Sequence, residues 1–165
     1  MQERRYEFGL DSFMAITAGL GGEPVGGDQV VRDTVEEGVL AERVGIDSFN
    51  VGEHYRDDMM DSAAHVVLAA IAGRTERIRL GTAVTVLSTQ DPVRLYHNFA
   101  TLDAVSGGRA QLILGRGSAI ESFPLFGYDL REYEEIFEEK LELFVKLLAA
   151  RVREPRLVTA NVVGG

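Results

Sequence analysis

A glutamate and a histidine, Glu53 and His54, stand where an apolar segment gives way to a polar one. The apolar residues Ser48–Gly52 have the character of a buried strand, and the polar stretch Tyr55–Asp58 follows. Catalytic groups of α/β proteins lie at the carboxyl ends of strands, where they face a ligand. An imidazole exchanges protons readily near neutral pH. The pair therefore predicts acid–base chemistry, although a histidine that only caps a loop explains it equally well.

A second candidate follows another apolar run, where Gly115–Gly117 places an arginine between two glycines. Such glycines let an anion or a flat ring approach the backbone, with Arg116 as the counter-charge, or they simply form a flexible turn. They do not make a dinucleotide-binding G-x-G-x-x-G, because Ile120 occupies the place of the third glycine. The earlier glycines, in Gly19–Pro24, put a proline there. An open dinucleotide-binding fold is therefore not predicted.

The composition narrows the class of protein and of partner. With 165 residues and 45% hydrophobic content, the chain can bury the core of one domain. Its 17 basic and 26 acidic residues give a net charge of -9, which disfavours nucleic acid and anionic membranes as partners. The absence of cysteine excludes thiol chemistry and disulfides. Without an apolar leader or membrane-spanning run, the sequence predicts a cytoplasmic location.

Strands and helices are predicted to alternate, which is typical of a parallel sheet with crossover helices. The expected strands are Tyr6–Asp11, Asp47–Gly52, Ile78–Val86 and Ala110–Gly115. Helices are expected from a cap at Asp28 to Gly45, from a cap at Asp61 or Ser62 to Gly73, from Asp91–Pro92 to Gly107–Gly108, and from Asp129 through Leu148. Strand starts recur about every 30 to 40 residues, the length of a βαβ unit.

The second expected helix is apolar almost all round, since only His65 is polar between Ala63 and Ala72. An outer helix of a barrel normally keeps a wet face. We therefore expect this helix to bury that face against another subunit, in a homodimer. A crowded internal helix is the alternative.

Five segments in this order and spacing resemble the bacterial luciferase-like monooxygenases, a family of flavin-dependent oxidoreductases. They are Val51–His54, Arg79–Val84, Asp91–Arg94, Leu102–Arg109 and Leu114–Gly117, and Phe123–Gly127 adds to them. The resemblance runs from about Tyr6 to Leu148. It implies a TIM-like (β/α) barrel, usually dimeric, that uses reduced FMN and O₂ on a small organic substrate. A flavin reductase would supply the reduced flavin, and some relatives use the deazaflavin F420 instead.

The resemblance also assigns roles around the flavin. His54 matches the strand-end histidine that handles protons beside the flavin, and Glu53 matches the acid before it. Ala83 matches a small residue at the end of the third strand, where the family often has a non-proline cis peptide against the flavin ring. His54 and Glu53 are thus the expected catalytic residues.

Further cofactor-binding residues are expected after the fourth strand. Arg116 matches the arginine that helps to anchor the flavin phosphate. Gly117 and Ser118 match positions that line the same loop, and Glu121 matches an acidic loop position near the flavin.

The chain is shorter than the family pattern requires, because a complete (β/α)₈ barrel takes ~250 residues. Residues 1–150 are expected to form the N-terminal half of the barrel, and 151–165 a linker or divergent tail. Within that tail, Leu157–Val163 reads as a fifth strand or as an unrelated extension. We expect a fragment whose open sheet edges favour the association of two copies.

Three other functions remain open from the sequence. An F420-dependent hydride-transfer enzyme would use the same scaffold. A metal-dependent TIM-barrel hydrolase would take Glu53, His54, Asp57 and Asp58 as ligands, but the first strand has no histidine pair, so no metal site is predicted. A catalytically inert fragment is the third.

Overall fold

The computed structural model describes residues 6–117, 120–150 and, as backbone, 159–162. In chain order the elements are β1 (Gly9–Ser12), α1 (Gly27–Val44), β2 (Ser48–Val51), α2 (Ala64–Ala72), β3 (Arg79–Thr82), β4 (Thr85–Val86), α3 (Pro92–Ser106), β5 (Gln111–Gly115), α4 (Ser122–Phe126), η1 (Leu130–Glu132), α5 (Tyr133–Ala150) and β6 (Thr159–Val162). The predicted alternation of strands and helices is confirmed.

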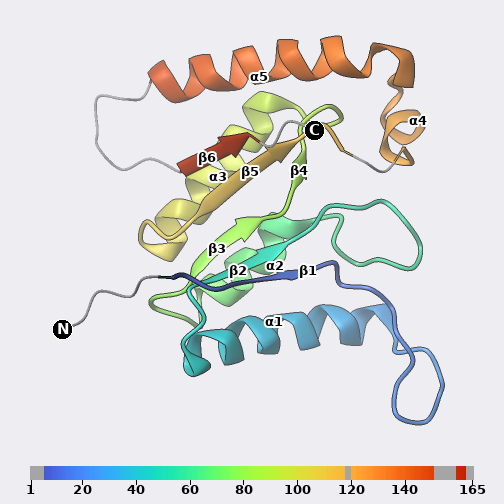
Figure 1. The fold of residues 1–165 in the computed structure, drawn as a ribbon, viewed down its shortest axis with the longest axis vertical. Helices are drawn as coiled ribbons and strands as arrows, with labels where there is room; N and C mark the ends of the chain where they lie inside the picture. The colour runs from blue at the N-terminus through green and yellow to red at the C-terminus, as the bar shows by residue number, and fades with distance from the viewer. Residues whose placement is uncertain (1–5, 118–119, 151–158, 163–165) are drawn as a thin grey trace.

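All strand pairs are parallel, as the alternation predicts. One three-stranded sheet has the order β1-β2-β3 and the other β4-β5-β6. A parallel bridge between Leu80 and Ala110 joins β3 to β5, so the two sheets continue into each other. The carboxyl ends of the strands consequently point to one side, where the loop 13–26, the loop 52–63 and α4 lie (Figure 1).

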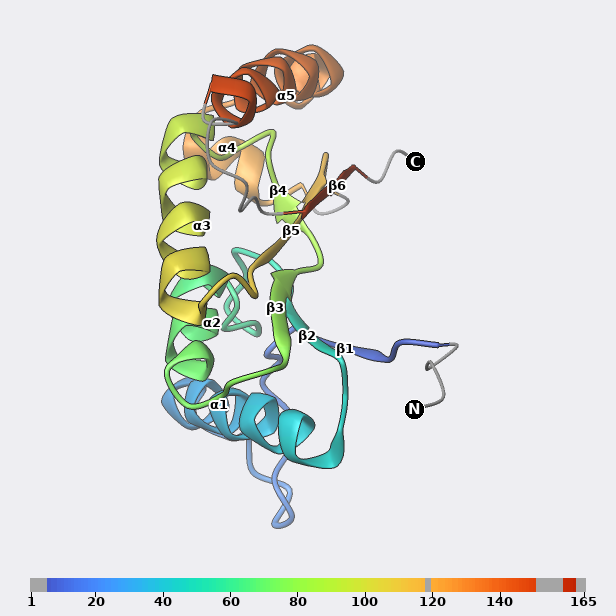
Figure 2. The ribbon, with the colours of Figure 1, turned by 90° about the vertical axis from the view of Figure 1, so that its left-hand side faces the viewer.

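The core lies between the strands and the helices α1, α2 and α3, all of which cover the same side of the strands (Figure 2). None of the described helices covers the opposite side. Large side chains with under 2% exposure fill the core, among them Phe49 and Leu80 from the strands, Leu68 and Ile71 from α2, and Phe99 from α3. Alternation along the strands produces this division, because neighbouring side chains point to opposite faces.

The predicted third strand, Ile78–Val86, is interrupted. A cis peptide bond between Ala83 and Val84 separates β3 from β4. The two pieces pair with different neighbours, β3 with β2 and β4 with β5, so the chain changes partner at this bond. The first strand begins at Gly9 rather than Tyr6, and within the predicted tail Thr159–Val162 pairs in parallel with β5.

Several predicted helix ends are confirmed, and two predicted starts are wrong. Asp91 accepts the backbone N–H of Arg94, and Gly45 and Gly107 end their helices in the left-handed conformation. By contrast, α1 starts at Gly27, with Asp28 inside its first turn and no side-chain cap. No side chain caps α2 either, so Asp61 and Ser62 do not have the predicted capping role.

The apolar character of α2 is largely explained within the chain. The helix lies between α1 and α3 and buries Val67, Leu68 and Ile71. Val66 stays 60% exposed, so only a narrow apolar strip is open to a second subunit. Every helix in the described residues is too short or too polar to span a lipid bilayer.

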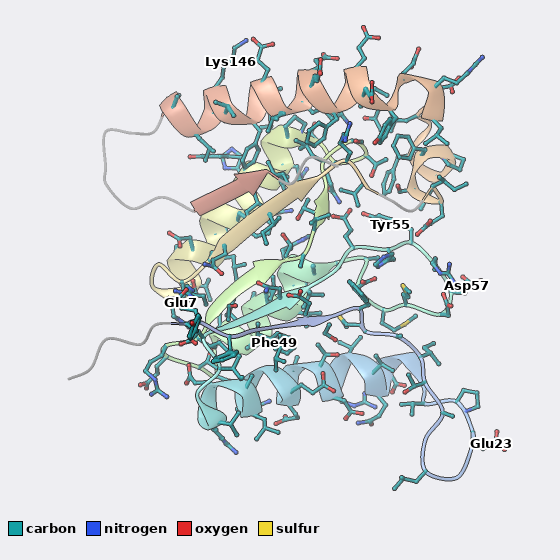
Figure 3. The ribbon with its side chains drawn as sticks, in the orientation of Figure 1. Glu7, Glu23, Phe49, Tyr55, Asp57 and Lys146 are labelled. Atoms are coloured by element: carbon teal, nitrogen blue, oxygen red, sulfur yellow. The ribbon has the colours of Figure 1, made fainter. Side chains whose placement is uncertain are left out.

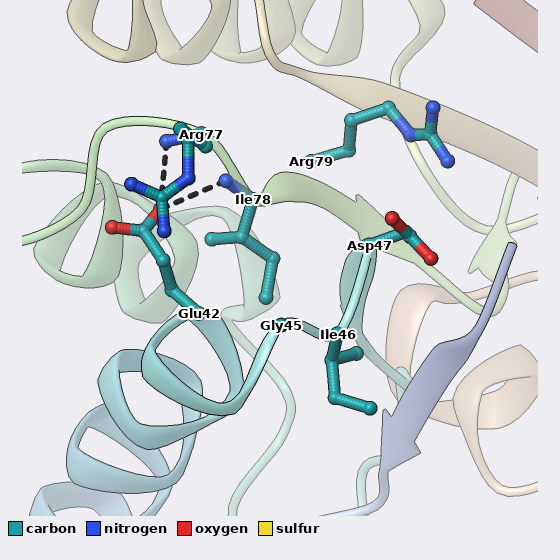
Figure 4. Close-up of a pocket in the computed structure, with 7 residues that line it drawn as sticks. All are labelled: Glu42, Gly45, Ile46, Asp47, Arg77, Ile78 and Arg79. Carbon is teal, nitrogen blue, oxygen red and sulfur yellow. Dashed lines mark hydrogen bonds between the residues drawn. The ribbon is translucent and has the colours of Figure 1, made fainter. Parts of the chain in front are cut away.

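The end of the sheet opposite the loops 13–26 and 52–63 is held by two polar clamps. The Glu42 carboxylate, at the end of α1, accepts the backbone N–H groups of residues 76, 77 and 78 beside a cavity of about 420 Å³ (Figure 4). The Arg109 guanidinium donates to the carbonyl oxygens of Ala72, Thr75, Ile78 and Ser106. These bonds join the end of α2 and the start of β3 to the end of α3.

Replacing Arg109 by alanine should therefore destabilise the fold. The change leaves several half-buried carbonyls without their donor, at a cost of about 2 to 3 kcal/mol in the free energy of unfolding. Urea unfolding measures the loss. Arg131→Ala, which removes an exposed arginine that pairs with Asp129, is the matched control and should leave stability nearly unchanged. Equal stability of the two variants would contradict the clamp.

Candidate functional site

A cavity of about 230 Å³ lies at the carboxyl ends of the strands. It is lined by Phe13, Glu53, His54, Ala83, Val84, Val86 and Gly117. These residues follow β1, β2, β3 and β5 or belong to β4, and the parallel register brings them together. Val51, the last residue of β2, lies beside Thr82, the last residue of β3, so Glu53 and Ala83 leave the sheet side by side.

The His54 ring is held by a buried carboxylate. Its Nδ1 lies 2.8 Å from Oδ2 of Asp61, and its backbone N–H donates to Oδ1 of the same residue at 3.0 Å. The Asp61 side chain is fully buried, while that of His54 keeps 20% exposure. The Phe13 ring meets the imidazole edge-on, with centroids 5.4 Å apart. The histidine therefore has a fixed orientation at the cavity wall.

The Glu53 carboxylate is the centre of a second network. Oε1 accepts the Tyr55 hydroxyl at 2.8 Å and the Gln90 side-chain amide at 2.6 Å. Oε2 accepts the backbone N–H of Val86 at 3.0 Å. The carboxylate thereby joins the exit of β2 to β4 and to the segment that precedes α3. Tyr55 itself follows His54 on the loop after β2 (Figure 3).

Two groups of this network have raised pKa values, and burial is the largest cause of both shifts. Burial raises the pKa of the Glu53 carboxyl, while the hydrogen bonds from Gln90, Tyr55 and Val86 oppose the shift by favouring the charged form. Burial, followed by the negative charge of Glu53, raises the pKa of the Tyr55 hydroxyl, so this phenol stays protonated at neutral pH. The tyrosine is thus a hydrogen-bond donor to Glu53.

One wall of the cavity requires small residues. The cis peptide Ala83–Val84 lies at the end of β3, at the position where the resemblance implies one. Gly117 has a φ of 86°, and a Cβ there would lie 2.7 Å from Val86. A Cβ on Gly115 would lie 2.4 Å from Val84. Side chains at either glycine would therefore press into the residues that form this wall.

The other predicted cofactor residues that the structure describes, Arg116 and Glu121, differ in their distance from this cavity. Arg116 stands next to Gly117; its guanidinium lies over the Tyr133 ring, 5.4 Å from the centroid, and 3.5 Å from Glu134. Glu121 lines a different, open cavity of about 630 Å³ beside α4. Ser118 lies outside the described residues. The structure thus brings His54, Glu53, Ala83 and Gly117 into one cavity, with Arg116 adjacent and Glu121 apart.

Sequence reasoning missed the residues that hold the site. Asp61 reads as a helix cap, and Gln90 lies 37 positions from its partner Glu53 with no local pattern to mark it. Tyr55 and Phe13 look like ordinary aromatic residues. For Asp61 a signal existed, because an acidic residue seven positions after a candidate histidine is a possible ring partner. Among residues 6–117 and 120–150, no group of three or more acidic or histidine side chains is arranged to hold a metal ion.

Comparison with known proteins assigns the family. The sequence profile described as luciferase-like monooxygenase matches residues 10–157, which is most of the chain. The protein therefore belongs to the luciferase-like monooxygenase family. The described strands and helices are a partial set of the β/α units of its TIM-like barrel.

Relatives within this family differ in cofactor and reaction. The chain is 34% identical over 122 residues to an F420-dependent glucose-6-phosphate dehydrogenase of Amycolatopsis mediterranei, covering 71% of this chain and 36% of that protein. It is 29% identical over 119 residues to the alkanal monooxygenase alpha chain of the Kryptophanaron alfredi symbiont, covering 72% and 33%. The chain thus spans about a third of the length of these relatives.

A solved structure has the same fold. The oxygenating constituent of 3,6-diketocamphane monooxygenase from Pseudomonas putida, a type II Baeyer–Villiger enzyme in complex with FMN, matches with a TM-score of 0.75 at 23% identity. The match covers 86% of this chain and 39% of that one. At this identity the likeness supports the fold.

The raised pKa of Glu53 predicts how stability depends on pH. An acid whose pKa is higher in the folded state than its ordinary 4.5 binds more protons when folded, so the wild type loses stability as pH rises above 4.5. Glu53→Gln removes this dependence. Urea unfolding at a series of pH values should show that the free energy of unfolding of the variant rises relative to that of the wild type from pH 4.5 upward.

Glu7 provides a control of opposite sign. Its hydrogen bond and ion pair with Arg79 lower its pKa, so it stabilises the fold above 4.5 and loses that effect as pH falls through its folded pKa. The wild type therefore gains stability as pH rises toward 4.5, whereas Glu7→Gln does not, so the variant should become less stable than the wild type over this range. A constant difference for Glu53→Gln across the series would show that its carboxyl is not perturbed by burial.

Proposed function

We propose that this chain contributes the flavin-binding side of an oxidoreductase that uses reduced FMN and O₂ on a small organic substrate. The observation that carries the proposal is the shared cavity of His54, the Ala83–Val84 peptide and Gly117 at the carboxyl ends of the strands. Ligands of (β/α) barrels bind at this end. The names of an alkanal monooxygenase relative and of an FMN-bound structural neighbour support the same reaction class.

The residues present fit one part of a flavin. The Ala83–Val84 peptide, Gly117 and the apolar Val86 offer a wall of small and apolar groups to a flat ring. Arg116 adjoins Gly117, and its guanidinium, which lies over the Tyr133 ring and 3.5 Å from Glu134, would give positive charge near the phosphate. A volume of about 230 Å³ is below the roughly 300 to 1,000 Å³ of complete small-molecule sites, so the remaining contacts must come from elsewhere.

The chain's own groups would orient the cofactor and control protons. When bound, the reduced flavin supplies the electrons that reduce oxygen. Phe13, Val84 and Val86 line the cavity and limit the access of water. His54 would accept or return a proton at the cavity, and Glu53 would keep the exit of β2 fixed to β4.

A second candidate uses F420 in place of FMN. The relative from Amycolatopsis mediterranei is named for its dependence on F420, and its identity to this chain is similar to that of the alkanal monooxygenase. Such an enzyme transfers a hydride and consumes no oxygen. For the FMN-dependent enzyme, two partners are also proposed. A second copy of the chain would contact the exposed strip of α2 at Val66, and a flavin reductase would supply the reduced FMN.

Cofactor titration tests the proposal directly. Anaerobic titration of the purified chain with reduced FMN, and in parallel with reduced F420, should give saturable binding to FMN, followed by absorbance and fluorescence. Ala83→Leu fills the cavity wall and should weaken that binding at least tenfold. Ala104→Leu adds the same side chain at an exposed position of α3 and should bind like the wild type.

The outcomes separate the candidates. Preference for F420 would support the hydride-transfer enzyme. Absence of binding to both would indicate an inert fragment. Equal binding by Ala83→Leu and Ala104→Leu would move the site away from this cavity.

The role of His54 is tested by a substitution that spares the cavity. His54→Gln should bind reduced FMN as the wild type does, but oxidise decanal with O₂ about 100-fold more slowly, the usual size of a lost acid–base group. Fatty-acid formation measures turnover. Unchanged turnover would exclude His54 from the chemistry, and a wild type that binds flavin but oxidises no aldehyde would refute monooxygenation of alkanals.

A further inference from the structure

Asp61 does not cap α2, although its position in the sequence predicts that role. It stands three residues before α2, yet no side chain caps that helix. Both of its carboxylate oxygens go instead to one residue, His54, at 3.0 Å to the backbone nitrogen and 2.8 Å to Nδ1. The side chain has no exposed surface, so water does not compete for these bonds.

The surrounding residues make room for this contact. A Cβ on Gly52 would lie 2.8 Å from Oδ2 of Asp61 and 2.6 Å from the Phe13 ring, so only glycine lets both groups approach the histidine from this side. Phe13 then packs edge-on against the imidazole, at an interplanar angle of 84°. The ring of His54 is thus fixed by a carboxylate and by an aromatic ring.

The two bonds to Asp61 decide which ring nitrogen carries the proton. A carboxylate only accepts hydrogen bonds, and its Oδ1 is occupied by the His54 backbone N–H, so Nδ1 must be the donor to Oδ2. In the neutral imidazole one nitrogen is a donor and the other an acceptor. With the proton on Nδ1, the lone pair is on Nε2.

We propose that Asp61 is a positioning residue that holds neutral His54 in the Nδ1–H tautomer and thereby makes Nε2 the proton acceptor at the cavity. The proposal deepens the proposed function, since it names the nitrogen through which His54 would act. It concerns the free chain, however, and its test needs neither cofactor nor substrate.

Long-range ¹H–¹⁵N NMR of the uniformly labelled chain reads the tautomer. The sequence has 3 histidines, so His65→Gln and His97→Gln variants assign the ring signals. At a pH high enough that the signals have stopped moving, His54 should show a protonated Nδ1 and an unprotonated Nε2. The reverse pattern, which would arise if Asp61 were protonated and donated to Nδ1, overturns the proposal.

An isosteric variant tests the cause. In Asp61→Asn, Oδ1 can still accept the His54 backbone N–H, which leaves the amide Nδ2 facing Nδ1. An amide N–H donates, so the ring should switch to the Nε2–H tautomer. Asp57→Asn removes the same charge from an exposed position of the same loop and should leave the tautomer unchanged (Figure 3).

Folding and function provide the remaining readouts. The backbone amide spectrum shows whether Asp61→Asn is folded; if it is not, the wild-type tautomer alone decides. In the decanal assay the folded variant should lose about 100-fold in turnover while it binds reduced FMN normally. An Nδ1–H tautomer retained in Asp61→Asn would overturn the role of Asp61. A wild type with the expected tautomer but no flavin binding would refute the proposed function and leave this inference intact.

Discussion

The parallel register of the strands is the constraint on which the site depends. Because β1, β2 and β3 are paired in the same direction and Val51 lies opposite Thr82, the residues that follow each strand emerge at one rim. Parallel strands need crossover helices, and α1, α2 and α3 all return on the same side. A shift of one residue between β2 and β3 would turn alternate side chains to the other face and separate His54 from Ala83.

Two buried carboxylates, Glu53 and Asp61, then fix the positions of the residues at this rim through hydrogen bonds. Glu53 ties the exit of β2 to β4 through the Val86 N–H, and Asp61 ties the loop after β2 to the imidazole. Both are buried, at 7% and 0% exposure, and both have donors for their oxygens. A buried charge is tolerated only when it is hydrogen-bonded, so these contacts hold the local backbone to one arrangement.

The sheet is covered by helices on one side, while the cavity by itself is smaller than a complete cofactor site. The chain also spans only about a third of the length of its relatives. Both facts agree with the proposal that the described elements form one wall of a larger cofactor site.

The sequence by itself determined what depends on neighbours along the chain. Short apolar runs and helical patterns located the strands and helices, and Gly45 and Gly107 marked helix ends. The polar pair after an apolar run identified Glu53 and His54 as candidates. It also carried enough of the family pattern to indicate the barrel, through short segments whose order is specific even though each one is weak.

Only the tertiary structure decided what depends on contacts across the chain. The split of the expected third strand follows from a change of pairing partner, from β2 to β5, which no local pattern records. Asp61 hydrogen-bonds to His54 rather than capping α2, and Gln90 hydrogen-bonds to Glu53. Both contacts depend on loops that fold back against a strand end. Capping residues and buried hydrogen-bond partners are the same residue types, so the three-dimensional neighbourhood alone tells them apart.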